Sequence, residues 1–213
     1  MKKNPNNAVI FKLLQPVFNV LFYAAVFLIV LSVILTVIIF FINVAPEQML
    51  FAPFMSRITD GSGEISGYKI SFGNGINIIT AAGDVGLDDI KAALYAGISV
   101  FICTLLTVAP VFKFLYMLLK NINSKKYMDI LDPKNPRYVM YIGLCVFFGT
   151  ILIRFMMRFY NYYLAVRFIK GAPQEIKLSL GIDILSGITG LAILFIGTIF
   201  AFVSERIRER GEQ

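Results

Sequence analysis

Four long apolar stretches constrain the fold of this chain more than any other feature of its sequence. The first, residues 17–42, contains no charged side chain. An α-helix rises about 1.5 Å per residue, so this stretch is about 39 Å long as a helix and can cross a hydrocarbon core of about 30 Å. Similar apolar stretches cover residues 92–119, 138–160 and 182–204. The sequence therefore predicts an all-α integral membrane protein with four transmembrane helices.

The composition agrees with this class and argues against a nucleic-acid-binding protein. Hydrophobic residues make up 58% of the 213 residues and charged residues only 15%, whereas about a quarter of a soluble domain is charged. The net charge is +7, but the lysines and arginines gather at the ends of the apolar stretches. That placement is typical of membrane topology signals and not of a basic patch. We therefore predict the lipid bilayer as a partner and no direct nucleic-acid binding.

The distribution of positive charge predicts an orientation with both termini in the cytoplasm. In this orientation 12 lysines and arginines lie on the cytoplasmic side and 8 lie outside, spread over more of the chain. The cytoplasmic parts are then the N-terminus, the loop 120–137 and the tail 205–213. The outer parts are the segment 43–91 and the loop 161–181. We expect a multi-pass protein of the plasma (inner) membrane.

The outer segment 43–91 differs from the rest of the chain because it is polar and rich in glycine. Residues 64–72 and 75–80 partly alternate polar and apolar side chains, and a Gly-Asn-Gly sequence lies where they meet. Glycine and asparagine tolerate the positive φ of tight hairpin turns. We predict a small extracytoplasmic β-hairpin between the first two transmembrane helices, followed by a helix start in the acidic residues 84–89.

The residues that usually carry enzyme chemistry are missing or scattered. The chain has no histidine, which removes the commonest general base and metal ligand. Its two cysteines, Cys103 and Cys145, lie inside apolar stretches and have no metal-binding spacing. No phosphate-binding loop or nucleophile motif is present. We predict no catalytic residues, no metal site, no cofactor and no enzymatic activity.

Three ionisable residues within or beside the apolar stretches are candidates for a functional role. Arg154 and Arg158 are four residues apart, so they share one face of the third helix. Asp183 begins the fourth helix at a similar predicted depth. We predict an interhelical ion pair between Asp183 and one of the two arginines. The alternatives are that the arginines extend to lipid headgroups, or that the group binds a ligand or ion.

Small residues and a proline predict how the helices pack and bend. Ser186, Gly187 and Gly190 allow close approach of a second helix. We favour packing within the chain over dimerisation, although a homo-oligomer stays open. Pro110 lies inside the second apolar stretch and is expected to kink or locally unwind that helix.

Three segments also resemble a known family: Phe114-Leu115-Tyr116, the run from Ile130 to Arg137 that leads into Tyr141-Ile142-Gly143, and the run from Ile199 to Arg206. These segments are similar to those of the bacterial four-helix membrane proteins of domain of unknown function twenty-nine seventy-five. The resemblance implies a four-helix layout and a cytoplasmic helix-turn-helix regulator as partner. It implies no catalytic residues.

The charged loop 120–137 and the tail 205–213 admit two interpretations. They anchor the chain against anionic lipid, or they form a docking surface for a soluble partner. Together with the resemblance, the sequence favours a non-enzymatic regulatory or interaction protein of the bacterial inner membrane. The alternative is a small oligomeric transport or channel component, or a subunit of a membrane complex.

Overall fold

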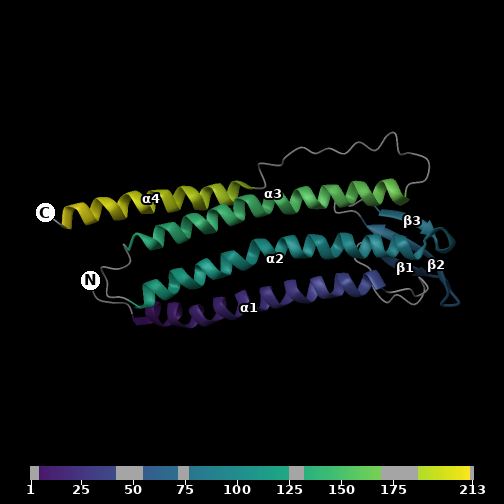
Figure 1. The fold of residues 1–213 in the computed structure, drawn as a ribbon, viewed down its shortest axis with the longest axis horizontal. Helices are drawn as coiled ribbons and strands as arrows, with labels where there is room; N and C mark the ends of the chain where they lie inside the picture. The colour runs from purple at the N-terminus through teal and green to yellow at the C-terminus, as the bar shows by residue number, and fades with distance from the viewer. Residues whose placement is uncertain (1–4, 42–54, 72–76, 125–131, 169–186, 212–213) are drawn as a thin grey trace. The chain divides into compact units, whose positions relative to one another are not determined.

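A computed structural model describes residues 5–41, 55–71, 77–124, 132–168 and 187–211 of the chain. Four long α-helices account for most of them (Figure 1): α1 Pro5–Phe41, α2 Leu87–Ser124, α3 Lys134–Phe168 and α4 Ile188–Gly211. Between α1 and α2 lie the strands β1 Met55–Thr59, β2 Ile65–Ser71 and β3 Asn77–Ala81, followed by the short 3₁₀ helix η2 Ala82–Asp84. The chain is thus mostly helical, with one small sheet.

All four helices are long and apolar enough to cross a membrane. In the most apolar 18-residue window of each helix, only 11–17% of the residues are buried within the protein. The large apolar side chains of these windows are therefore mostly exposed or half-buried, which water does not tolerate over so large an area. A surrounding hydrocarbon solvent accounts for this pattern. The predicted set of four helices long and apolar enough to span a membrane is confirmed.

The helices extend beyond the apolar stretches from which they were predicted. α3 begins at Lys134, where residues 134–137 had been assigned to a loop. Its start is stabilised by Asp132, whose Oδ1 accepts a hydrogen bond from the backbone N–H of Lys134 at 2.8 Å. Proline is favoured at the start of a helix, and Pro133 lies directly before Lys134. α2 is one α-helix with Pro110 inside it, and the predicted kink or local unwinding at Pro110 stays a prediction.

The residues divide into two compact units, which are described separately. The helical unit comprises Met1–Ile29, Thr104–Leu152 and Asp183–Gln213. The sheet unit comprises Val30–Cys103 and Ile153–Ile182.

In the helical unit, side chains of α1 and α2 contact each other. The rings of Phe18 and Phe112 lie 6.1 Å apart. The side-chain amide of Asn123 donates hydrogen bonds to the carbonyl oxygen of Phe11 at 3.2 Å and to Oε1 of Gln15 at 2.9 Å. These bonds satisfy polar groups near the ends of two apolar helices, where an unpaired group would be costly.

α2 and α3 are joined in the same way within this unit. The ring of Phe114 lies 5.2 Å from that of Tyr141. Asn135 is fully buried, and its Oδ1 accepts a hydrogen bond of 2.7 Å from the side-chain amide of Asn121. A buried amide without such a partner would destabilise the fold, so this pair holds the start of α3 against α2.

In the sheet unit, the strands form an antiparallel sheet in the order β1-β2-β3. The predicted pairing of the second and third strands is present, with Gly67 opposite Ala81 and Ser71 opposite Asn77. The turn predicted between them lies outside the described residues. β1 was not predicted, and it pairs with β2 from Met55 opposite Ile70 onward.

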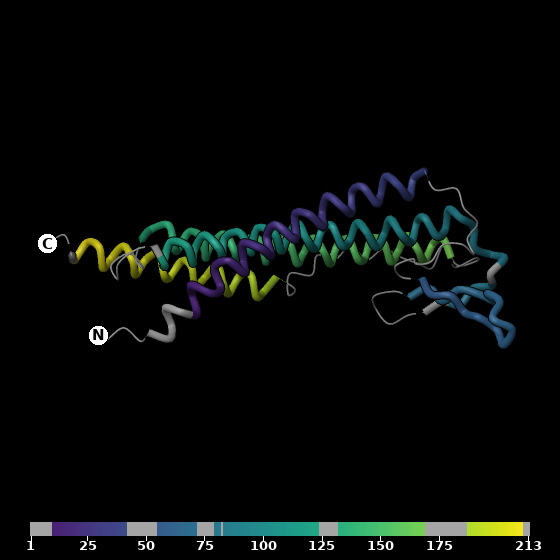
Figure 2. The backbone as a smooth tube through the Cα atoms, turned by 90° about the horizontal axis from the view of Figure 1, so that it is seen from below, coloured from purple at the N-terminus to yellow at the C-terminus, as the bar shows by residue number. Residues whose placement is uncertain are grey.

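The sheet packs on helices of its own unit (Figure 2). Ile70 of β2 is completely buried in a cluster with Ala93 and Ala96 of α2 and Leu164 of α3. A second cluster surrounds Tyr68 and is completed by five buried apolar residues: Ile39, Val85, Ile90, Leu94 and Ile98. Burial of these side chains stabilises the unit by roughly 1.5–3 kcal/mol for each large residue.

Candidate functional site

A groove in the helical unit joins the two polar segments that the sequence had singled out separately. It has a volume of about 500 Å³. One wall comes from the start of α3 and the other from the last turns of α4, as its lining residues show: Pro133, Pro136, Arg137, Met140, Ala201, Ser204, Glu205, Arg208 and Glu209. Both segments had been placed on the cytoplasmic side. The fold thus brings residues 133–137 of the predicted loop and residues 205–209 of the predicted tail to one surface.

Two features of the sequence build this groove. α4 stays helical to Gly211, seven residues beyond its predicted apolar stretch, so its charged turns are held in a regular geometry. Gly197 lets α4 approach α3 closely, because a Cβ there would lie 2.8 Å from Cγ of Met140. Met140 is thereby held at the base of the groove, one turn beyond Arg137.

The groove has an apolar floor and a charged rim. Met140, Ala201 and the fully buried Pro136 supply the floor. Ser204 is also buried, and its hydroxyl donates to the carbonyl oxygen of Ala201 at 2.8 Å, so it offers no free donor to a ligand. Four charged side chains form the rim, two of each sign: Arg137, Arg208, Glu205 and Glu209. An apolar centre within a polar rim is the usual anatomy of a protein-binding surface.

The chemistry of the groove favours binding over catalysis. A nucleophile needs an adjacent base, and the hydroxyl of Ser204 is already engaged with a backbone carbonyl. Among the described residues, no three histidine, cysteine or acidic side chains come close enough together to hold a metal ion. The groove can offer a partner its shape and a rim that carries charged groups of both signs.

The predicted ion pair of Arg154 or Arg158 with Asp183 stays a prediction, because Asp183 lies outside the described residues. Arg154 is exposed, and Arg158 is partly buried and interacts with another group. Both are in α3. The side chains of the two arginines are therefore placed, and their contact with Asp183 stays a prediction.

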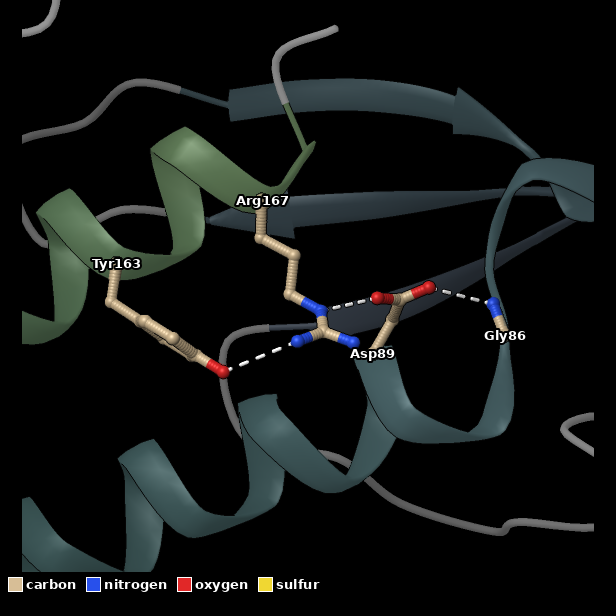
Figure 3. Close-up of polar contacts among 4 residues, drawn as sticks. All are labelled: Gly86, Asp89, Tyr163 and Arg167. Carbon is tan, nitrogen blue, oxygen red and sulfur yellow. Dashed lines mark hydrogen bonds and ion pairs between the residues drawn. The ribbon is translucent and has the colours of Figure 1, made fainter. Parts of the chain in front are cut away.

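A different ion pair, which the sequence reasoning missed, ties α2 to α3 in the sheet unit (Figure 3). Nε of Arg167 donates to Oδ1 of Asp89, and Nη1 of Arg167 donates to the hydroxyl of Tyr163 at 3.2 Å. The other carboxylate oxygen of Asp89 accepts the backbone N–H of Gly86 at 2.7 Å. Asp89 thus caps the start of α2 and fixes the last turn of α3 with one side chain.

The candidate helix-packing residues lie where α4 meets α3. A Cβ at Gly187 would lie 2.5 Å from Cδ2 of Phe147, and one at Gly190 would lie 2.3 Å from the backbone nitrogen of Phe147. Ser186 lies outside the described residues. The sequence reasoning missed Gly143 of α3, where a Cβ would lie 2.7 Å from the backbone nitrogen of Leu194. Close packing of α3 on α4 within the chain accounts for these glycines.

No family model matches the chain, and no curated protein or solved structure does.

Proposed function

We propose that this chain is a non-enzymatic, multi-pass membrane protein that binds a soluble protein partner in the groove between α3 and α4. One observation carries the proposal. Two segments that are far apart in the sequence form a single groove of about 500 Å³ with an apolar floor and a rim of both charges. Such a groove suits an amphipathic segment that inserts one apolar side chain toward Met140 and places charges against the rim.

The orientation forms part of this proposal. The positive-inside rule supports cytoplasmic termini, and it would place the groove in the cytoplasm and the three-stranded sheet outside. In bacteria the membrane would be the inner one. The resemblance to domain of unknown function twenty-nine seventy-five supports a regulatory role and a helix-turn-helix regulator as the partner.

Labelling of single cysteines tests the orientation. In a variant with Cys103 and Cys145 replaced by alanine, we would introduce Ser62→Cys beside β2 or Arg210→Cys near the end of α4. A membrane-impermeant maleimide should label the first in intact cells and the second only after permeabilisation. The reverse pattern would refute the orientation, and it would place the groove outside the cell.

A pull-down in mild detergent from the native membrane, followed by mass spectrometry, tests the binding function. Arg208→Glu reverses a charge on the groove rim, and Arg210→Glu reverses one two residues away that does not line the groove. Arg210 is exposed, so it is a matched control on the same helix. We expect a soluble partner with the wild type and with Arg210→Glu, and at least tenfold less of it with Arg208→Glu, because reversing one charge of a docked pair costs more than about 1.4 kcal/mol.

Other outcomes would contradict the proposal. If both variants retain the partner equally, the partner binds elsewhere. If the wild type recovers only copies of itself or other membrane subunits, the transport or channel alternative replaces this one, and flux into liposomes becomes the next assay.

A further inference from the structure

A lysine of α2 within the helical unit lies among aromatic rings. Nζ of Lys113 is 4.7 Å from the ring centre of Phe22 and 6.0 Å from that of Tyr23, both in α1. On its own helix it is 5.4 Å from the ring centre of Tyr116. The same ring also faces a second ammonium group, Nζ of Lys120, at 5.9 Å. Two cations therefore share one tyrosine.

The rings compensate these charges only in part. An aromatic face attracts a cation through its quadrupole, but it carries no net charge. Among the described residues, no carboxylate lies within ion-pairing distance of Lys113 or Lys120. The two ammonium groups repel each other, and Lys113 belongs to the apolar stretch 92–119, where an unneutralised charge is costly. An anion placed beside Tyr116 would relieve both effects.

The position of the pair along α2 indicates which anion. Lys113 lies within the apolar stretch and Lys120 just past its end, two helical turns or about 10 Å further along. On the predicted span 92–119, this is where hydrocarbon would give way to lipid headgroups. Tyrosines concentrate at that boundary, and Tyr23 is 59% exposed there. Its hydroxyl, like that of Tyr116, can donate a hydrogen bond to a phosphate oxygen.

We propose that Lys113, Lys120 and Tyr116 of α2, with Phe22 and Tyr23 of α1, form a binding site for the phosphate of an anionic membrane lipid. Both lysines contact the phosphate. The rings hold the aliphatic chain and the ammonium group of Lys113 at the depth of the lipid headgroup. An anionic lipid is preferred over a zwitterionic one, because only the former brings net negative charge to two ammonium groups that no described carboxylate pairs with. This site is independent of the groove between α3 and α4.

Native mass spectrometry of the full chain in mixed micelles tests the site. The probes are phosphatidylglycerol and phosphatidylcholine with the same acyl chains. We expect Lys113→Gln and Lys120→Gln each to weaken phosphatidylglycerol binding about fivefold, which corresponds to about 1 kcal/mol for one lysine at an anionic surface. Lys113→Arg should retain most of the binding, because it keeps the charge and stacks on the same rings.

Lys12→Gln is the matched control. This substitution removes the same charge from an exposed lysine of α1 in the same unit. Lys12 makes none of the contacts with aromatic rings described above. If Lys12→Gln weakens binding as much as Lys113→Gln does, diffuse surface charge explains the affinity and the site is refuted. Equal binding of phosphatidylcholine would also refute it. Displacement of the lipid by millimolar inorganic phosphate would assign the site to a free anion and overturn the lipid proposal.

Discussion

Gly190→Ala should destabilise the protein, although a change from glycine to alanine inside a helix ordinarily does the opposite. At Gly190 of α4, an added Cβ would lie 2.3 Å from the backbone nitrogen of Phe147 and 2.6 Å from its Cα. Both atoms belong to the backbone of α3, so they cannot turn aside as a side chain could. The two helices would have to separate by about 1 Å to reach an ordinary contact of about 3.5 Å.

The magnitude follows from two opposing terms. Overpacking of this kind costs typically 1–3 kcal/mol, and a gap of 0.5–1 Å loses a quarter to a half of each neighbouring van der Waals contact. Replacing glycine by alanine in a helix returns up to about 1 kcal/mol. We expect a net loss of about 1–2 kcal/mol, or a melting temperature lower by roughly 2–8 °C for a chain of this size.

The two cysteines provide the assay, because the chain has no tryptophan. Cys103 and Cys145 are free thiols and partly buried in helices, so a maleimide dye that fluoresces on reaction reports their exposure as detergent-solubilised protein is heated. Gly187→Ala is the matched control, since the three atoms nearest to its Cβ would be ring atoms of Phe147, which can rotate. A melting temperature for Gly190→Ala equal to or above the wild-type value would refute the close approach of α4 to α3.

Three further changes test the sheet unit. Asp89→Ala removes both the cap of α2 and the ion pair to α3, and it should cost about 1–2 kcal/mol in the same thermal assay. Gly67→Ala would place a Cβ 2.6 Å from the carbonyl oxygen of Thr80, so we expect weaker pairing of β2 with β3 and faster trypsin cleavage after Lys69. Hydrogen bonds from the hydroxyl and backbone N–H of Ser62 lower the pKa of Asp60, so Ser62→Ala should raise that pKa, as measured by carboxyl NMR titration.

Two of these predictions have a control substitution, and the third predicts the direction of a pH effect. Asp88→Asn alters a neighbouring acidic residue of the same helical turn, and it should have little effect. Gly61→Ala meets no atom within 4 Å, so it should leave trypsin cleavage unchanged. The lowered pKa of Asp60 means that its stabilisation of the β1–β2 turn is present above the ordinary pKa and is lost as the pH falls below about 4. A turn that loosens at neutral pH instead would contradict this account.

The helices could be predicted because their signal is local and strong. An uncharged stretch such as 17–42 has few alternatives to a transmembrane helix, whatever the rest of the chain does. Helix ends are weaker signals, because they depend on caps. The start of α3 depends on Asp132 and Pro133, which also occur in ordinary turns. The predicted loop therefore included the first turn of α3.

β1 was not predicted because a strand of five residues is too short to show a clear alternation of polar and apolar side chains. Its sequence, Met-Ser-Arg-Ile-Thr, has only two apolar positions, and its register shifts between Ile58 and Thr59. The signal that could have found it lies in the turn. Asp60-Gly61 is a common hairpin sequence, and Gly63 has a φ of 85°, which glycine adopts without strain. The carboxylate of Asp60 then accepts the backbone N–H groups of Ser62 and Glu64, which closes the turn.

Ion pairs between helices could not be predicted from the sequence alone. Similar depth along two helices predicts that Asp183 pairs with Arg154 or Arg158, but depth does not fix which face of one helix meets another. Arg167 and Asp89 are 78 residues apart, and their contact depends on how α2 and α3 pack beneath the sheet. A local clue existed: Asp89 stands three residues after Gly86, the position of a capping acid. A carboxylate that caps a helix is fixed in space. It is a better candidate for an ion pair than a freely rotating carboxylate, because it loses less side-chain entropy on pairing.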